Sequence, residues 1–474
     1  MWFRSDLRTS DNAALAAAGS VPGATIVACF AVCAEQWREH DMAGVKVDFI
    51  LRGLQDLSKR LAELNIPLLI ILAPRFENVP EAMVRLASGH SCRAVFFNDE
   101  YEINERRRDD AVVDALAAAG VEARRFTDQV LVAPGEVRTG EGRYFTVFTP
   151  FRKALYRAID ERGGVVLHDC PRKQAPTGIT PSPVPERVAG FASRVPSDLW
   201  PAGEAAAAER LDRFVRSGMR VYGDRRDLPA LDGTSALSPY LSVGAVSVRQ
   251  CVLAAMGVQG GRLEGASAGA TQWISELAWR EFYKHVLVGY PRVCMGRAFK
   301  PQTDRIRWSK DDRGFSAWCE GRTGVPIVDA GMRQLKAIGW MHNRVRMITA
   351  MYLSKDLFID WRLGERHFMQ HLVDGDLGSN NGGWQWSAST GTDAAPYFRI
   401  FNPVTQSRRF DADGAYIRRY VPELADLEGG EKGAIHDPEV LPDLARARLD
   451  YPRPIVDHAA AKARVTAAFR ALSE

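Results

Sequence analysis

The first 128 residues alternate short apolar runs with amphipathic helical patterns, and this order restricts the fold more than any other feature. Short apolar runs suit parallel strands that are buried on both faces. Their alternation with helices predicts a doubly wound α/β domain, in which Trp2 and Phe3 end a first strand. The apolar runs occupy residues 24–32, 66–73 and 94–98, and the helical patterns occupy residues 45–64, 79–87 and 105–119.

Several classes of protein are excluded by what the sequence lacks. No GxGxxG follows a strand and no GxxxxGK[ST] occurs, so there is neither a dinucleotide fingerprint nor a P-loop. No apolar run approaches the roughly 20 residues that span a bilayer, and the first residues, MWFRSDLR, contain no apolar signal core. The seven cysteines form no CxxC pair, which favours reduced thiols over a disulfide or zinc framework.

The middle of the chain changes character. Six prolines between Pro171 and Pro196 argue against long regular elements over residues 129–199, which we interpret as a connector. From residue 200 onward the patterns are mostly helical. Because 474 residues are many for a single core, we expect an α/β domain at 1–128 and an all-α domain at 200–474.

The net charge of +4 is small but unevenly placed. Residues 1–128 carry 15 basic and 19 acidic side chains, whereas residues 272–420 carry 22 basic and 15 acidic ones. The second window also holds eight of the eleven tryptophans. Positive charge among aromatic side chains is typical of nucleic-acid binding through phosphates and base stacking, although a solvated basic face gives the same counts.

The stretch DGDLGSNNGGWQW, at residues 374–386, carries the densest set of functional groups. Its four glycines favour close backbone approach or positive φ, and they argue against one continuous helix. Its two carboxylates, two amides and two tryptophans would suit the edge and faces of a flat heteroaromatic ligand. A helix-to-helix turn capped by Asp and Asn would use the same residue types.

A predicted helix at residues 271–289 also gathers polar and aromatic side chains. Trp273, Glu276 and Arg280 follow each other at spacings of three and four, with Trp279 alongside. These side chains could line a cavity. Alternatively, Glu276 and Arg280 form an ion pair on a surface helix.

Two further segments are candidates. The turn TSALS at residues 234–238 offers hydroxyl and backbone N–H groups ahead of a helix, which suits a phosphate but equally suits a helix cap. A predicted helix at residues 340–353 places an amide and a thioether one turn apart between two arginines. These side chains are Asn343, Met347, Arg344 and Arg346.

His367 and His371 are four residues apart, a spacing that can bind a metal ion. The sequence between them, HFMQH, lacks the glutamate of the HExxH motif, and no further ligands accompany the pair. We therefore expect no metal site.

The motifs WFRSDLR with DNAAL, TSALS, WREFY and GWMHNRVRM, with the block from DGD to TQ that ends at Gln406, belong together. They resemble the photolyase/cryptochrome family from Trp2 to about Pro454, and they are most similar to its bacterial class I cyclobutane pyrimidine dimer photolyases. The resemblance implies an antenna-binding α/β domain and a helical domain that binds FAD and DNA.

The resemblance implies that the helical domain holds FAD. The turn at 234–238 would hold the phosphates, Asp374 and Asp376 would meet the polar flavin edge and its ribose, and Asn380 would face flavin N5. A nearby Arg346 would favour the anionic flavin electrostatically. The implied FAD residues are Tyr222, Thr234, Ser235, Ala236, Leu237, Ser238, Trp273, Arg280, Arg346, Asp374, Gly375, Asp376 and Asn380.

The resemblance also implies electron transfer from excited reduced flavin to a pyrimidine dimer flipped out of the duplex. Trp279 and Trp386 resemble the stacking walls of the lesion pocket. The implied catalytic residues are Glu276, Asn343, Met347 and Asn380, and the implied DNA-binding residues are Arg226, Glu276, Trp279, Tyr283, Asn343, Arg344, Trp386, Arg399 and Gln406.

Three tryptophans match the chain that photoreduces oxidised flavin in this family. They are Trp384, Trp361 and Trp308, in order from the flavin outward. Their sequence separations do not fit one helix stripe. Packing in the core is the alternative for each, because tryptophan is usually mostly buried.

An antenna chromophore is implied as well. In members with a folate antenna, methenyltetrahydrofolate lies between the domains, and His40, Asn104, Glu105 and Cys294 match that site. Met295 stands where a lysine is common, which leaves a deazaflavin as the second candidate.

The alternatives to dimer repair are a cryptochrome-type photoreceptor and a DASH-type or (6-4) photolyase. Asn380 is typical of photolyases, whereas plant cryptochromes carry Asp there and animal ones Cys. A DASH enzyme would favour Gln at Met347, and a (6-4) enzyme would favour His at Asn343 or Met347. We expect a monomeric, cytoplasmic bacterial lyase that meets UV-damaged DNA at the nucleoid and no membrane.

Overall fold

The computed structural model describes residues 1–430 and 433–472. The chain divides into two compact units whose sequences interleave. The predicted boundaries at residues 128 and 199 both lie inside the first segment of unit 1. Unit 1 comprises Met1–Gly223, Ser235–Cys294 and Val373–Gly378, and unit 2 comprises Asp224–Thr234, Met295–Leu372 and the described residues of Ser379–Glu474.

The parallel strands of unit 1 confirm the predicted α/β fold. β1 (Trp2–Phe3), β2 (Ala28–Val32) and β3 (Leu68–Leu72) form one sheet in that order, with β2 in the centre. β4 (Ala94–Asn98) pairs with β5 (Glu122–Phe126). The sequence pattern missed β5, because its residues EARRF include three charged side chains and form no apolar run.

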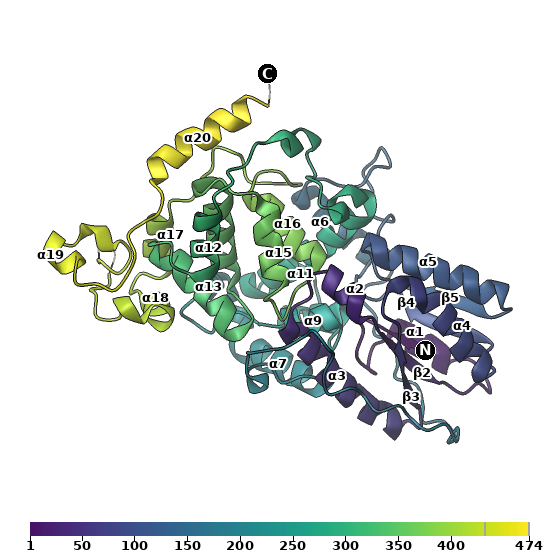
Figure 1. The fold of residues 1–474 in the computed structure, drawn as a ribbon. Helices are drawn as coiled ribbons and strands as arrows, with labels where there is room; N and C mark the ends of the chain where they lie inside the picture. The colour runs from purple at the N-terminus through teal and green to yellow at the C-terminus, as the bar shows by residue number, and fades with distance from the viewer. Residues whose placement is uncertain (431–432, 473–474) are drawn as a thin grey trace. The chain divides into compact units, whose positions relative to one another are not determined.

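The helices between these strands overlap the predicted ones. α3 (Gly44–Glu63), α4 (Val79–Gly89) and α5 (Ile103–Ala118) lie within a few residues of the patterns. α4 packs on α5, and α5 packs along β5 (Figure 1). α1 (Ala13–Gly19) follows β1 and packs against β4.

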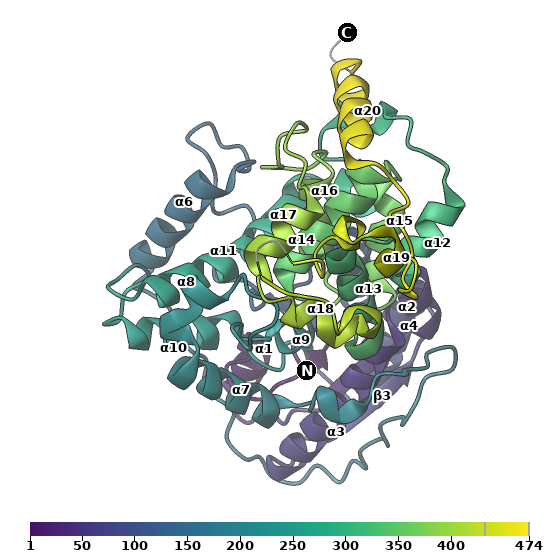
Figure 2. The same cartoon turned by 90° about the vertical axis from the view of Figure 1, so that its left-hand side faces the viewer.

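The expectation of no long regular element over residues 129–199 is wrong for α6 (Phe148–Glu161). The clustered prolines begin only at Pro171, and Pro150 lies in the first turn of α6, where proline is tolerated. α6 and α10 (Val248–Val258) both pack against α11 (Ala268–Gly289), which agrees with the predicted helix at 271–289 (Figure 2).

Unit 2 is built from helices around one apolar core. α13 (Pro326–Ile338) packs against α12 (Asp312–Glu320), α14 (Asn343–Met351), α17 (Pro403–Phe410) and α18 (Ala415–Tyr420) (Figure 2). The core includes four large side chains with almost no exposure, Trp318, Trp361, Trp384 and Tyr416. No helix in the described part of the chain is both long enough and apolar enough to cross a membrane.

The prediction that the glycines argue against a continuous helix is wrong from Leu377 onward, whereas residues 374–376 lie outside the helix. α16 spans Leu377–Ser387 and contains Gly378, Gly382 and Gly383, so these glycines take helical φ values rather than positive ones. Burial of Trp384 in the core offsets the helix-weakening effect of the glycines.

The predicted helix at 340–353 begins later than expected. α14 starts at Asn343, because the imidazole of His342 caps it by accepting a hydrogen bond from Arg344 N at 3.2 Å. Its far end widens into a π-helical turn, η6 (Tyr352–Asp356).

Candidate functional site

Two lysines fix the segment Val373–Gly378 to unit 1. Lys46 of α3 donates to the backbone carbonyl of Gly375. Lys284 of α11 lies 2.7 Å from Oδ2 of Asp376. Burial alone would lower the pKa of Lys284, but the neighbouring carboxylates raise it above its usual value. Asp374 is buried, so the predicted flavin-edge carboxylates stand in a polar loop with little access to water.

The predicted phosphate turn is a strained loop ahead of the short helix α9 (Ser238–Val243). Ala236 has a φ of 45°, a left-handed value that is costly for a residue with a side chain. Arg210 donates to Ser235 O at 3.1 Å, and Leu237 N donates to Ser235 Oγ at 3.4 Å. Thr234 belongs to unit 2, whereas the four residues that follow belong to unit 1.

The other predicted FAD residues of unit 1 lie on α11 or beside it. Tyr222 and Trp273 are buried against Phe214, with ring centroids 5.7 and 5.1 Å from it. Nη1 of Arg280 donates to Gln129 O at 2.6 Å, so part of its guanidinium binds backbone.

In unit 2, the amides of α16 are oriented by Glu365 of α15 (Trp361–Met369). Nδ2 of Asn380 donates to Glu365 O at 3.0 Å, and Nδ2 of Asn381 donates to Glu365 Oε1 at 2.8 Å. Asn380 is 9% exposed. Arg346, the predicted electrostatic partner, donates from Nε to Met341 O at 2.7 Å.

The three predicted electron-transfer tryptophans share the core of unit 2. Trp361 and Trp384 are buried in it, and half-buried Trp308 packs against its edge. The buried indole nitrogens of Trp361 and Trp384 have no hydrogen-bond partner among the described residues. Trp308 contacts Phe358, with ring centroids 5.1 Å apart, and lines a surface depression. The predicted tryptophan chain therefore has two buried inner members, Trp384 and Trp361, and one half-buried outer member, Trp308.

The predicted lesion residues of unit 1 follow one face of α11. Trp279 stacks on Phe148 of α6, with centroids 3.8 Å apart and an interplanar angle of 13°. Tyr283 contacts the same indole at 5.6 Å. Gln272 donates to Glu276 Oε1 at 2.8 Å, which holds this carboxylate on the helix surface. One face of Trp279 is therefore already covered.

The predicted lesion and DNA residues of unit 2 lie on α14, α16, α17 and the loops beside them. Asn343 is exposed and Met347 is half-buried, one turn apart as predicted. Arg226 and Arg344 converge on Asp227, at 3.9 and 2.9 Å. Further along the chain, Trp386 is half-buried against Phe401, Arg399 is exposed, and Gln406 lies on α17.

The four predicted antenna residues gather in unit 1. Nδ1 of His40 lies 3.4 Å from Glu105 Oε1, and Nε2 of His40 lies 3.1 Å from Nδ2 of Asn104. Burial would lower the pKa of His40, but the hydrogen bond and charge of Glu105 raise it. Burial raises the pKa of Cys294 to about 12, although a hydrogen bond from the Ile103 backbone opposes the shift. Cys294 thus reaches the same first turn of α5.

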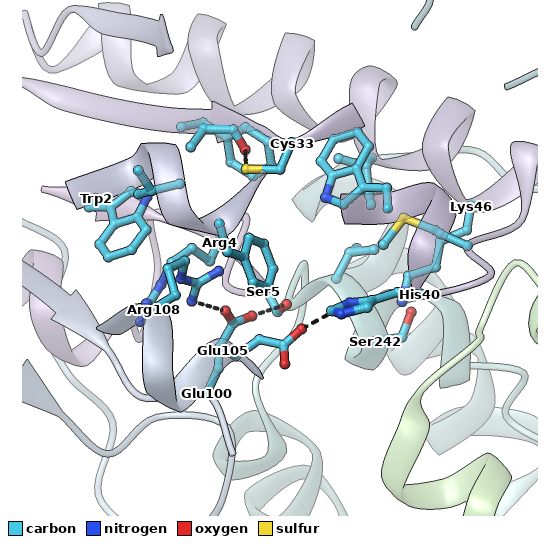
Figure 3. Close-up of a pocket in the computed structure, with 18 residues that line it drawn as sticks. Trp2, Arg4, Ser5, Cys33, His40, Lys46, Glu100, Glu105, Arg108 and Ser242 are labelled. Carbon is cyan, nitrogen blue, oxygen red and sulfur yellow. Dashed lines mark hydrogen bonds and ion pairs between the residues drawn. The ribbon is translucent and has the colours of Figure 1, made fainter. Parts of the chain in front are cut away.

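A pocket lies beside this cluster, at the carboxyl ends of β1, β2 and β4 (Figure 3). His40 and Glu105 point toward each other on one side of it, and an ionic cluster fills the other side. Arg108 pairs with Glu100 at 2.7 Å. Burial would raise the pKa of Glu100, but Arg108 and Arg4 together lower it to about 2. The pocket volume is about 100 Å³.

Comparisons with known proteins decide the family. The family models described as DNA photolyase and as the FAD binding domain of DNA photolyase match residues 1–173 and 273–471. The deoxyribodipyrimidine photo-lyase of Salmonella typhimurium is 44% identical over 474 residues, which cover 99% of this chain and 98% of the relative. The chain belongs to the DNA photolyase family.

Two solved photolyases share this fold along the whole chain. A bacterial class III photolyase from Agrobacterium tumefaciens is 36% identical with a TM-score of 0.87, and the match covers 100% of this chain and 97% of the other. An archaeal photolyase from Sulfolobus tokodaii, solved with two FAD molecules, is 27% identical with a TM-score of 0.78, and the match covers 99% of each chain.

The donor set of this photolyase fits FAD. The carboxylates of buried Asp374 and half-buried Asp376 suit N–H and hydroxyl groups, and the amide of Asn380 suits a ring nitrogen. The rings of His367 and His371 have centroids 4.2 Å apart and an interplanar angle of 35°, and Nδ1 of His371 contacts His367 O at 2.8 Å. That this pair holds no metal stays a prediction.

Sequence patterns missed four residues that support the site: Lys46, Lys284, Glu365 and Phe148. Each acts on a residue far away in the chain, so periodicity could not reveal it. The one available signal was Lys284 in WREFYKH, a cation on a helix that is otherwise buried over most of its surface.

Proposed function

We propose that this photolyase uses light to split cyclobutane pyrimidine dimers in UV-damaged DNA, as a deoxyribodipyrimidine photo-lyase. The observation that carries the proposal is the 44% identity along 98% of a relative with that name. Asn380, the residue typical of photolyases, supports it, and no observation favours a cryptochrome, DASH or (6-4) function. We expect the enzyme to act as a monomer on DNA in the cytoplasm.

The protein's share of the reaction is positioning and electrostatics. Bound FAD supplies the light absorption and the electron. Asp374, Asp376 and Asn380 orient its polar edge, while the turn at 234–238 holds its phosphates. Arg346 adds positive charge that favours an anionic ring.

The lesion residues receive the dimer. Trp279 and Trp386 stack on its bases, and Glu276, Asn343 and Met347 contact their edges. Arg226, Arg344 and Arg399 hold the strand by its phosphates, with Tyr283 and Gln406 as further DNA contacts. This division predicts that lesion preference and general DNA affinity can be separated by substitution.

Trp384, Trp361 and Trp308 restore the reduced flavin after oxidation by passing an electron inward. Among the described residues, the buried inner indoles have no hydrogen-bond partner that could take the indole proton. An oxidised inner tryptophan therefore keeps its proton and is readily reduced by the next one. The electron deficit is thereby passed outward to Trp308, where solvent and an external reductant have access.

For the antenna, the residues favour methenyltetrahydrofolate at His40, Asn104, Glu105 and Cys294. A deazaflavin is the second candidate. The buried ion pairs of Arg4 and Arg108 at the pocket beside these residues disfavour an apolar ring there.

The absorption spectrum of the purified protein tests both cofactors. We expect flavin bands and, after reconstitution with methenyltetrahydrofolate, an added near-ultraviolet band that Glu105→Ala removes. A folded protein without flavin would contradict the proposed function. Flavin bands without the added band would contradict only the folate assignment.

A further inference from the structure

Lys284 is a buried cation between two carboxylates that serve different sites. Its Nζ lies 2.7 Å from Oδ2 of Asp376 and 2.6 Å from Oε1 of Glu102. The side chain of Lys284 is 2% exposed, and those of Glu102 and Asp376 are 15% and 14% exposed. We propose that Lys284 is a positioning residue shared by the flavin site and the antenna site. The inference rests on the proposed function, because it uses both of those sites.

Glu102 connects Lys284 to the antenna residues. It is the N-cap residue of α5, so Ile103, Asn104 and Glu105 form the turn that directly follows it. Asn104 and Glu105 reach His40, and the sulfur of Cys294 is hydrogen-bonded to the backbone of Ile103. By fixing the position of Glu102, Lys284 therefore fixes the first turn of α5, around which all four antenna residues gather.

Asp376 connects the same lysine to the flavin residues. It directly precedes α16, whose second residue is Gly378. A Cβ added to Gly378 would lie 3.4 Å from Asp376 Oδ1 and 3.7 Å from Cδ of Lys284. The start of α16 therefore lies close to the stem of Lys284, beside the carboxylate that is predicted to meet the flavin.

Lys284 is the cation whose ammonium lies within 2.7 Å of both carboxylates, and Lys46 adds positive charge nearby. Lys46 is close, but its ammonium donates to the carbonyl of Gly375, and burial lowers its pKa. Burial likewise raises the pKa of Glu102, although Lys284 opposes that shift. Without Lys284, the carboxylates of Glu102 and Asp376 would face each other with little water. Either one carboxylate would become protonated, or the Asp376 loop and the first turn of α5 would move apart.

The test compares four substitutions by direct binding. Titration of flavin-free protein with FAD, and separately with methenyltetrahydrofolate, gives both affinities without any repair assay. Lys284→Met should weaken both by about tenfold or more, since breaking a buried pair leaves uncompensated charge. Glu102→Gln should weaken the folate alone, and Asp376→Asn should weaken FAD alone. Lys284→Arg should keep both within a few-fold.

Lys59→Met, an exposed change on α3, is the matched control and should alter neither affinity. Circular dichroism verifies that each variant is folded. If Lys284→Met does not fold, the same change combined with Glu102→Gln leaves a single carboxylate, and this double variant should still lose both ligands.

A folded Lys284→Met protein that keeps either affinity within twofold would overturn the shared role. A native protein that binds FAD but no folate would also overturn it, while leaving dimer repair intact. Absence of FAD binding in the native protein would instead contradict the proposed function, so the two failures are distinguishable.

Discussion

Nδ2 of Asn380 donates a 3.0 Å hydrogen bond to the backbone carbonyl of Glu365 on the adjacent helix α15. Because this bond fixes the amide plane, Oδ1 points away from that carbonyl. In the proposed site, this oxygen would accept a hydrogen bond from the N–H at N5 of the reduced flavin. Asn380 should therefore stabilise the reduced state.

Asn380→Ala should speed re-oxidation of the reduced flavin in air by about fivefold, the equivalent of about 1 kcal/mol for one hydrogen bond. The return of flavin absorbance after chemical reduction measures the rate. Glu365→Gln is a companion variant, because it keeps the backbone carbonyl that holds Asn380 and should leave that rate near the native value. An unchanged rate in Asn380→Ala would place flavin N5 elsewhere.

Trp308→Phe should lose photoreduction of oxidised flavin, because it removes the outer, solvent-accessible member of the chain. Repair should persist when the flavin is reduced chemically. The matched control is Trp318→Phe. Trp318 lies 5.9 Å from Trp384, but it is fully buried and its Nε1 donates to Thr349 O, so it leads to no external reductant. Normal photoreduction without Trp308 would remove this residue from the route.

The sequence predicted the elements that carry apolar runs, but it missed elements whose formation depends on contacts distant in the chain. Val95, Phe96 and Phe97 reveal β4 by their apolar run, whereas Arg124 and Arg125 conceal β5. Local glycine content likewise argued against α16, and it failed because helix formation there depends on burial of Trp384 against residues distant in the chain.

The candidate site shows the same division. Asp376, Glu105 and Trp279 were predicted by motif, but their partners Lys284, His40 and Phe148 lie 92, 65 and 131 positions away, respectively. The pairing of His40 with Glu105 followed from family resemblance, whereas the other two pairings had no sequence signal. Such contacts are set by tertiary packing, which periodicity does not encode.

Trp279→Ala should cost roughly 1–3 kcal/mol of preference for dimer-containing DNA, the range for a lost base–aromatic stack. Binding of undamaged DNA should persist, because the phosphate contacts of the arginines remain and still weaken as salt rises. Matched duplexes with and without one cyclobutane thymine dimer provide the comparison. Equal losses on both would mark Trp279 as a packing residue that supports Phe148.

Lys355 of η6 predicts a pH dependence of stability. It is 1% exposed, its Nζ donates to Arg399 O at 2.9 Å, and burial lowers its pKa to about 7 although Asp356 opposes the shift. Between this value and the unfolded value of 10.5 the unfolded state binds more protons, so the free energy of unfolding rises with pH.

The gain from Lys355 should be about 2.5 kcal/mol between pH 7.5 and 9.5, at up to about 1.4 kcal/mol per pH unit. Urea unfolding of the native protein and of Lys355→Met, followed by tryptophan fluorescence, isolates this contribution as the difference between the two. A difference that stays constant across the window would contradict the lowered pKa of Lys355.

Repair itself tests the central claim most directly. The purified enzyme, with its flavin reduced chemically, is mixed with an oligonucleotide that contains one cyclobutane thymine dimer and is then illuminated with blue light. Absorbance of the restored thymines should rise with light dose, remain flat in darkness, and remain flat with a (6-4) photoproduct. No rise under light with reduced flavin bound would contradict the assignment as a dimer-repairing photolyase.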